Sequence, residues 1–316
     1  MSTPSAAADR PGKIHARPVR HPWRWVAIAV ILVVVAMMVS SVVTNPNWNW
    51  SFAFEIMQQR PVIDGLWKGT IFGTIGAMVL GIVLGIALAV MRLSTNPVLR
   101  GVAFVYTWFF RAMPRYVLLA ILGGAIAVLY NPIDIGIPFG QQLSKALGLS
   151  NDLTFFSFSW NDISSSIWIG ILGLGLSGAA YMAEIARAGI LSVDRGQTEA
   201  AHALGMPPGK TMRRIVLPQA MRVIVPPTGN ETIAMVKDTS LFIAASIITE
   251  LYFQAYGFGS RTFQIVPGFM AATLWYLIVC SILMVGQYYL ERYYGRGFGA
   301  PSKATRRKLD TITAGH

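Results

Sequence analysis

The stretch EAAHALGMPPGKTMRRIVLP, residues 199–218, is a polar and basic segment between two strongly apolar parts of the chain. Residues 199–204 favour a helix with a small alanine face. The glycines and prolines between Gly205 and Gly209 interrupt the backbone, and residues 211–216 can form a second short helix that Pro218 ends. The pattern predicts a helix–turn–helix that projects into water between two spans. Its alanines, Leu204 and Met206 would enter a groove on a partner.

The composition indicates an all-α integral membrane protein. Hydrophobic residues make up 54% of the 316 residues and charged residues only 13%, whereas roughly a quarter of a soluble domain is charged. The net charge of +12 is compatible with nucleic-acid binding, but in a membrane protein it indicates an excess of Lys and Arg in cytoplasmic loops. The lone Cys280 lies in an apolar run, so the sequence predicts no disulfide and no metal site.

About six spans are expected, each of about 20 apolar residues. The third is interrupted near Pro114, the fifth is unusually polar and is expected to break at Pro226-Pro227, and Gly81 and Gly85 in the second predict a close helix approach. The first follows a basic leader, but it exceeds the about 7–15 apolar residues of a signal peptide and no cleavage site follows it. We therefore expect an extra, retained N-terminal span. The predicted spans are residues 25–43, 67–90, about 102–130, 167 to about 184, about 224–248 and 269–290.

Basic residues gather in alternate connections between these spans. This alternation predicts a multi-pass membrane protein of six spans with both termini in the cytoplasm. Residues 1–24 would be a disordered basic N-terminus, 296–316 a basic tail, and 131–166 an external insert that either caps the helix ends or docks a partner. The residues that set the orientation are Arg10, Lys13, Arg17, Arg20, Arg24, Arg92, Arg100, Arg187, Arg195, Lys210, Arg213, Arg214, Arg222, Arg292, Arg296, Lys303, Arg306, Arg307 and Lys308.

The polar segment contains a spaced motif: Glu-Ala-Ala, three residues, Gly, nine residues, Ile-x-Leu-Pro. It resembles the EAA loop by which membrane subunits of ABC importers bind a separate ATPase. Residues 179–190 before the loop, Pro218 to Arg222 and Lys237 to Leu241 after it, and Phe110-Arg111-x-x-Pro114 upstream are similar to the polar amino-acid branch of that family. The likeness covers about residues 65–295. The motif residues, which the resemblance assigns to ATPase coupling, are Glu199, Ala200, Ala201, Gly205, Ile215, Leu217 and Pro218.

The resemblance implies a type I ABC permease fold and a permease subunit that imports a polar or charged amino acid. No catalytic residue is expected, because ATP and Mg²⁺ would bind the partner ATPase. The other implied partners are an extracytoplasmic substrate-binding protein, a second permease copy or a paralogue, and the lipid bilayer, but no nucleic acid. The alternative is a self-contained channel or secondary transporter. An intrinsic P-loop ATPase is disfavoured, because Gly205 and Gly209 enclose three residues where that motif needs four.

Charged residues within the apolar runs mark a candidate translocation path. A central charge costs at least about 2.5–3.5 kcal/mol on insertion scales, so such groups usually face a cavity or a partner. The alternative is internal pairing, for instance of Lys237 with Glu231 or of Glu184 with Arg187. Three positions depart from the family pattern: Ala112-Met113, Arg115 and Ser177-Gly178. The candidate path residues are Arg111, Arg115, Asn230, Glu231, Lys237, Thr239 and Ser240.

Overall fold

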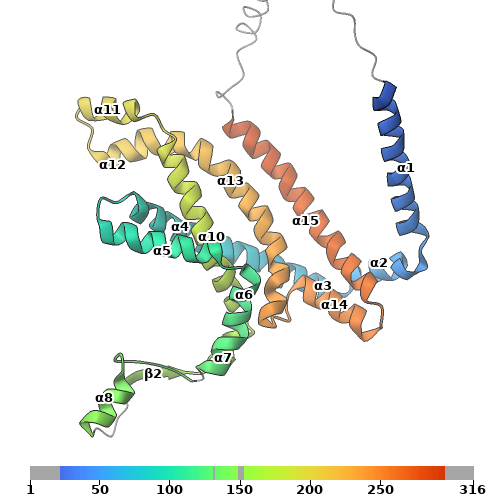
Figure 1. Ribbon diagram of the computed structural model, residues 1–316, viewed down its shortest axis with the longest axis horizontal. Coiled ribbons are helices and arrows are strands. Elements are labelled where there is room, and N and C mark those ends of the chain that lie inside the picture. The colour runs from blue at the N-terminus through green and yellow to red at the C-terminus, as the bar shows by residue number, and fades with distance from the viewer. Residues whose placement is uncertain (1–21, 131, 149–152, 296–316) are drawn as a thin grey trace, which may run out of the picture. The chain divides into compact units, whose positions relative to one another are not determined.

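The computed structural model describes residues 22–130, 132–148 and 153–295, most of which are helical (Figure 1). The expected basic tail, and the expected disordered N-terminus up to residue 21, lie outside the described residues. Residues 22–24 already belong to a helix, so that part of the predicted disordered leader is wrong. The chain divides into two compact units, residues 1–49 and 50–316, which are described in turn.

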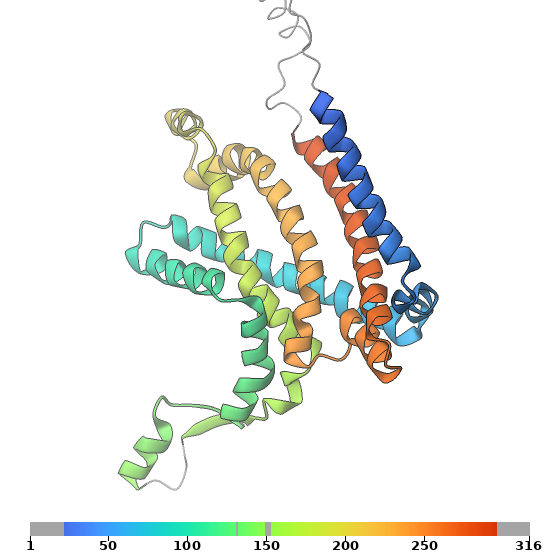
Figure 2. The same ribbon diagram turned by 45° about the vertical axis from the view of Figure 1, so that its right-hand side comes forward.

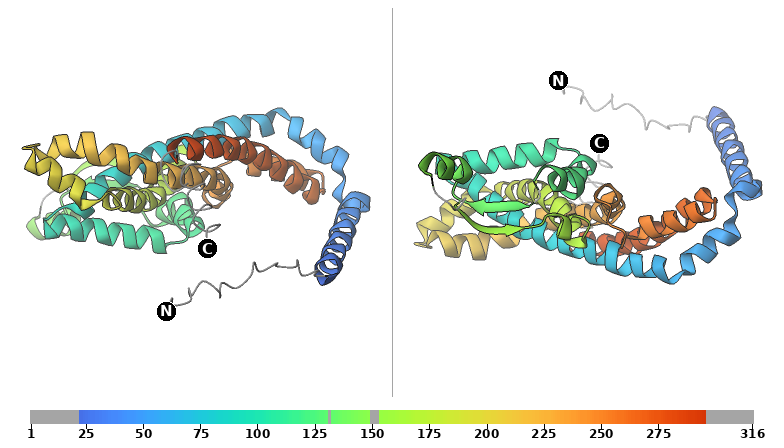
Figure 3. Two further views of the ribbon diagram at one scale, coloured as in Figure 1. Left: turned by 90° about the horizontal axis from the view of Figure 1, so that it is seen from above. Right: turned by 90° about the horizontal axis from the view of Figure 1, so that it is seen from below.

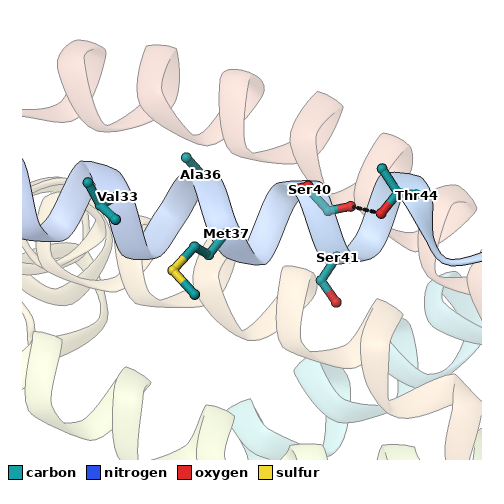
Figure 4. Close-up of a pocket in the computed structure, with 6 residues that line it drawn as sticks. All are labelled: Val33, Ala36, Met37, Ser40, Ser41 and Thr44. Carbon is teal, nitrogen blue, oxygen red and sulfur yellow. Dashed lines mark hydrogen bonds between the residues drawn. The ribbon is translucent and has the colours of Figure 1, made fainter.

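The described part of the first unit is the helix α1, Pro22–Thr44, followed by the 3₁₀ turn η1, Pro46–Trp48. Residues 25–44 are apolar or small, and α1 is long and apolar enough to cross a membrane. Small and polar side chains follow one another at helical spacing along its second half, where Thr44 Oγ1 donates to the carbonyl oxygen of Ser40 at 2.7 Å (Figure 4). Asn45 then caps η1 by accepting from the Asn47 amide, and Pro46 occupies the first position of the turn.

The second unit begins with a series of helices, one pair of which is sharply bent at Pro114. Helix α5 starts at the Asn96 cap, whose Oδ1 accepts from the Val98 amide at 2.9 Å, and it ends before Pro114. The helices on the two sides of this proline differ in direction by 98°, which confirms the predicted interruption. The elements are α2 Trp50–Gln58, α3 Arg60–Asp64, π-helical η2 Gly65–Ile71, α4 Phe72–Leu93, α5 Pro97–Ala112, α6 Arg115–Ala120, π-helical η3 Ile121–Ala125 and α7 Ile126–Leu129.

The second half of this unit holds the polar segment and the last predicted spans. Helix α13 runs through Pro226 and Pro227 without a break, although a break was predicted there. Gln287 Nε2 of α15 donates to the Pro226 carbonyl at 2.8 Å, which ties α15 to α13 at this position. The elements are α10 Ile167–Leu191, α11 Arg195–Ala203, α12 Pro208–Thr211, π-helical η4 Met212–Val216, α13 Leu217–Asp238, 3₁₀-helical η5 Thr239–Ala245, α14 Leu251–Arg261 and α15 Ile265–Tyr294.

Among the described helices, four are long and apolar enough to cross a membrane, or five if the bent pair on the two sides of Pro114 is one span. They include every predicted span except the fifth, which corresponds to α13. That helix carries Arg222, Glu231, Lys237 and Asp238 and is correspondingly polar. Its place in the membrane therefore depends on neighbours that cover those charges.

The predicted external insert folds into a small hairpin. Strands β1, Ile133–Gly136, and β2, Thr154–Phe158, pair antiparallel with Ile133 opposite Phe158, and helices α8, Gly140–Leu147, and α9, Asn161–Ser164, accompany them. Within the second unit, the hairpin and α11–α12 lie at opposite ends (Figures 1 and 2). The strands were not predicted, because the apolar stretches of the insert are short and irregular in sequence.

The centre of the second unit is the packing of α10 against α4 and α13 (Figure 3). A Cβ added to Gly85 would lie 2.6 Å from Met182 Cβ, so α4 and α10 approach as closely as the spacing of Gly81 and Gly85 predicts. Phe242 of η5 is completely buried in contact with Gly73 and Gly170. These glycines thus make room for the aromatic ring that fixes the end of α13 to the core.

Candidate functional site

The polar segment is a rigid two-helix projection whose shape follows from its sequence. Asp194 caps α11 by accepting from the Gly196 amide at 2.7 Å. At the other end, the Met206 amide donates to Ala201 O at 3.0 Å and the Gly205 amide to His202 O at 2.9 Å. These two bonds form a Schellman motif, which requires the left-handed φ of +73° found at Gly205. The predicted helix–turn–helix is present at this position.

One correction concerns where the second helix ends. The prediction was that Pro218 ends it, but helical structure continues from Pro208 through η4 into α13 and on to Asp238. Pro218 lies where η4 passes into α13, and the helical run continues through it. The segment is therefore directly continuous with α13, and it joins α13 to α10.

The motif residues divide into a buried anchor and an exposed surface. Ala201 is only 2% exposed, whereas Glu199, Ala200 and Leu204 are exposed, and Leu204 is 83% exposed. Farther along, Ile215 is half-buried, and Leu217 and Pro218 are exposed at the start of α13. A recess beside them is lined by Pro207, Gly209, Lys210, Arg213 and Arg214. The segment thus presents an alanine and leucine surface next to three positive charges.

A second group of the predicted residues meets around Arg115, the first residue of α6. Its Nη2 donates to Glu231 Oε1 at 2.6 Å, Nη1 donates to Asp238 Oδ2, and Nε donates to Ser177 Oγ at 3.1 Å. The Arg115 and Glu231 side chains are 16% and 15% exposed. This arrangement, which we call the Arg115 bridge, ties α6 to both α10 and α13.

The Tyr181 ring of α10 forms one wall of the Arg115 bridge. The guanidinium carbon of Arg115 lies 5.0 Å from the ring centroid and that of Arg111 lies 5.6 Å away, which is within the range of cation–π attraction. Neither Tyr181 nor Asp238 was in the predicted set. The seven-residue spacing from Glu231 to Asp238, two helical turns on one face, is the sequence signal that would have identified Asp238.

The remaining predicted path residues are not part of the bridge. Asn230 and Lys237 are exposed on another face of α13, and Ser240 Oγ donates to the Lys237 carbonyl. Thr239 is fully buried and lies beside Glu250. Of the two internal pairs considered, Glu184 with Arg187 is present, with Arg92 as a further partner at 3.2 Å. The other is wrong, because Glu231 pairs with Arg115 and not with Lys237.

Glu250 forms a second buried polar centre, in the core of the second unit. Its side chain is completely buried, and Oε1 accepts from Thr70 Oγ1 at 2.8 Å and from Tyr276 OH at 2.5 Å. Oε2 caps α14 by accepting from the Tyr252 amide at 2.7 Å. Since its partners come from η2, η5, α14 and α15, Glu250 connects distant parts of the chain rather than facing a path.

Comparisons with known proteins agree with this architecture. Residues 81–295 match the family "Binding-protein-dependent transport system inner membrane component". The chain is 43% identical over 295 residues to the arginine transport system permease protein ArgU of Corynebacterium glutamicum, covering 93% of this chain and 87% of that protein. It is 31% identical to the L-cystine transport system permease protein TcyB of Bacillus subtilis, covering 77% of this chain and 92% of that one.

A solved structure shows the same fold. It is a crystal structure of an amino acid ABC transporter with histidines, matched with a TM-score of 0.58 at 26% identity over 74% of this chain and 94% of that chain. The family match favours the importer subunit over the alternative prediction, a self-contained channel or secondary transporter. The chain belongs to the family of binding-protein-dependent transport system inner membrane components, and it is an amino-acid permease subunit of an ABC importer with the type I fold.

Proposed function

We propose that this subunit carries a basic amino acid of the arginine class and that a separate ATPase drives it through the exposed surface of α11. The single observation that carries the coupling role is the connection of the polar segment, which is rigid and exposed, continuous with α13 and joined to α10 by residues 192–194. A force applied to α11 reaches the two helices that hold Arg115. ATP and Mg²⁺ bind the ATPase in this proposal.

The substrate class has two supports. The similar permease from Corynebacterium glutamicum is named for arginine transport. In this chain, Glu231 and Asp238 already bind a guanidinium group, that of Arg115. An extracytoplasmic binding protein would deliver the solute, and a second copy or a paralogous permease would complete the path.

The membrane orientation follows from the same arrangement. Within the second unit, α11–α12 and the C-terminal end of α15 lie at the same end (Figures 1 and 2). This supports an orientation in which the basic residues of both regions face the cytoplasm and the hairpin of β1 and β2 lies on the outer side.

Uptake into proteoliposomes tests the proposal. The chain is reconstituted with its ATPase subunit and binding protein, and labelled arginine, glutamate and cystine are supplied outside with ATP inside. We expect ATP-dependent accumulation of arginine well above that of the other two. Arginine uptake that persists without ATP hydrolysis would refute the coupling, and preferred uptake of glutamate or cystine would refute the substrate class.

Glu199→Lys should weaken ATPase binding by about tenfold, because it reverses a charge in the centre of the exposed α11 surface, and a factor of ten corresponds to about 1.4 kcal/mol. Binding is measured by pull-down of the ATPase subunit with the purified permease. Asp134→Lys makes the same charge change at an exposed position of β1, and it should leave ATPase binding unchanged. Equal binding by Glu199→Lys and the wild type would count against α11 as the docking helix.

A further inference from the structure

We propose that Arg115 is an internal counter-ion that a cationic solute displaces during passage, so that Arg115 sets the requirement for a positively charged side chain. This inference rests on the proposed function, since it concerns the same basic solute. The argument has three steps: which carboxylates a cation can reach, what group the bridge already binds, and whether that group can leave.

The first step concerns the carboxylates of the described membrane helices. Most are committed to other partners away from the bridge: Asp64 pairs with Lys68, Glu184 pairs with Arg92 and Arg187, and Glu291 accepts from Gln287 in the last turns of α15. Glu250 is fully enclosed by its donors. Among the described residues, Glu231 and Asp238 are therefore the carboxylates that lie between α6, α10 and α13 and could bind a cationic solute. Both are paired with Arg115.

The second step is that the bridge binds a guanidinium group by each of its edges. Two nitrogens donate to two different carboxylates, the third donates to Ser177, and the guanidinium carbon lies 5.0 Å from the centroid of the Tyr181 ring. This is the pattern by which proteins distinguish the planar guanidinium fork from the compact ammonium of lysine. A guanidinium-bearing solute that takes the place of Arg115 keeps the charge of the bridge balanced.

The third step is that the position of Arg115 allows its side chain to move away from Glu231 and Asp238. It is the first residue after the 98° bend at Pro114, and the bridge keeps some access to the surface, since the Asp238 side chain is 27% exposed. Arg115 also contacts α10 and α13, the two helices that the polar segment joins. A movement of that segment therefore changes the distance between the partners of Arg115.

Thermal unfolding of the full chain with its ATPase subunit in nanodiscs tests the exchange directly. We expect Arg115→Ala to unfold at a lower temperature than the wild type. Ethylguanidinium at millimolar concentration should raise the Tm of this variant by about 2–4 °C, because it refills the vacated position. It should raise the Tm of the wild type less, because there it competes with Arg115 for the same position. The uncharged analogue ethylurea should have no effect.

The matched control is Arg111→Ala, because Arg111 contacts the same Tyr181 ring, while the described residues contain no ion pair to it. Its Tm should not respond to ethylguanidinium. Arg115→Gln is measured alongside and should show the same rise, which covers the case in which the alanine variant does not fold. An absent rise in the Arg115 variants overturns the proposal. So does an equal rise after Glu231→Gln and Asp238→Asn are added, because the binding would then not involve the bridge.

The unfolding measurement tests the counter-ion role, and the uptake assay tests the proposed function, so a negative result in one can be distinguished from a negative result in the other. If arginine is imported but ethylguanidinium does not stabilise the Arg115 variants, only the counter-ion role is wrong. If another class of solute is imported, the substrate class of the proposed function is wrong, whatever the bridge binds.

Discussion

Gly205→Pro should reduce ATP-driven uptake by about a hundredfold while leaving the chain in the membrane in normal amount. Gly205 has φ of +73°, whereas proline is held near −65° and has no amide to donate to the His202 carbonyl. The substitution therefore destroys the Schellman turn, at a cost of roughly 3 kcal/mol or more in that conformation. The helix α11 would lose its fixed direction relative to α13. Uptake and ATP hydrolysis are measured together in proteoliposomes, where hydrolysis should continue without transport.

Gly205→Ala is the control for this experiment. A Cβ at Gly205 has open space around it, with no atom within 4 Å, so alanine tests the backbone conformation alone. The left-handed conformation costs a non-glycine residue roughly 1 kcal/mol, so we expect most of the uptake to be retained. Normal uptake by Gly205→Pro would refute the rigid-joint role of the turn.

Glu250→Ala should destabilise the second unit more than any other single substitution considered for this chain. It leaves the buried hydroxyls of Thr70 and Tyr276 and the Tyr252 amide without their acceptor. Unsatisfied buried groups cost about 1–3 kcal/mol each, so we expect the free energy of unfolding to fall by about 3 kcal/mol or more. The measurement is thermal unfolding in detergent, in which each kcal/mol corresponds to roughly 2–4 °C for a unit of this size.

Glu250→Gln and Glu291→Ala are the comparisons. The glutamine keeps an acceptor for the hydroxyls, so its loss should be smaller than that of alanine. Glu291 is exposed and accepts one bond, from Gln287, and its removal should cost less than about 1 kcal/mol. If Glu250→Ala unfolds at the wild-type temperature, Glu250 does not hold these elements together.

The parts of the fold that were predictable depend on local chemistry. The turn at Gly205 is encoded within a few residues, by glycine and prolines after a helix-forming run. The interruption at Pro114 and the close approach at Gly85 are likewise direct consequences of residue type.

The parts that were missed depend on contacts between distant residues. Pro226 and Pro227 predicted a break, but α13 continues through both, and Gln287 of α15, 61 residues later, bonds the Pro226 carbonyl. Glu231 could have paired with Lys237 on its own helix, but Arg115 lies 116 residues away in sequence and reaches Asp238 as well. The hairpin of the insert gave no alternating pattern strong enough to predict strands.

The Glu250 centre has a consequence for the order in which the chain is made. Tyr276 follows Glu250 by 26 residues. At a synthesis rate of about 5–20 residues per second, Tyr276 is added about one to five seconds after Glu250. During that interval, α14 is completed and the first turns of α15 are made. A chain that stops before Tyr276 therefore leaves the Glu250 carboxylate without one of its donors.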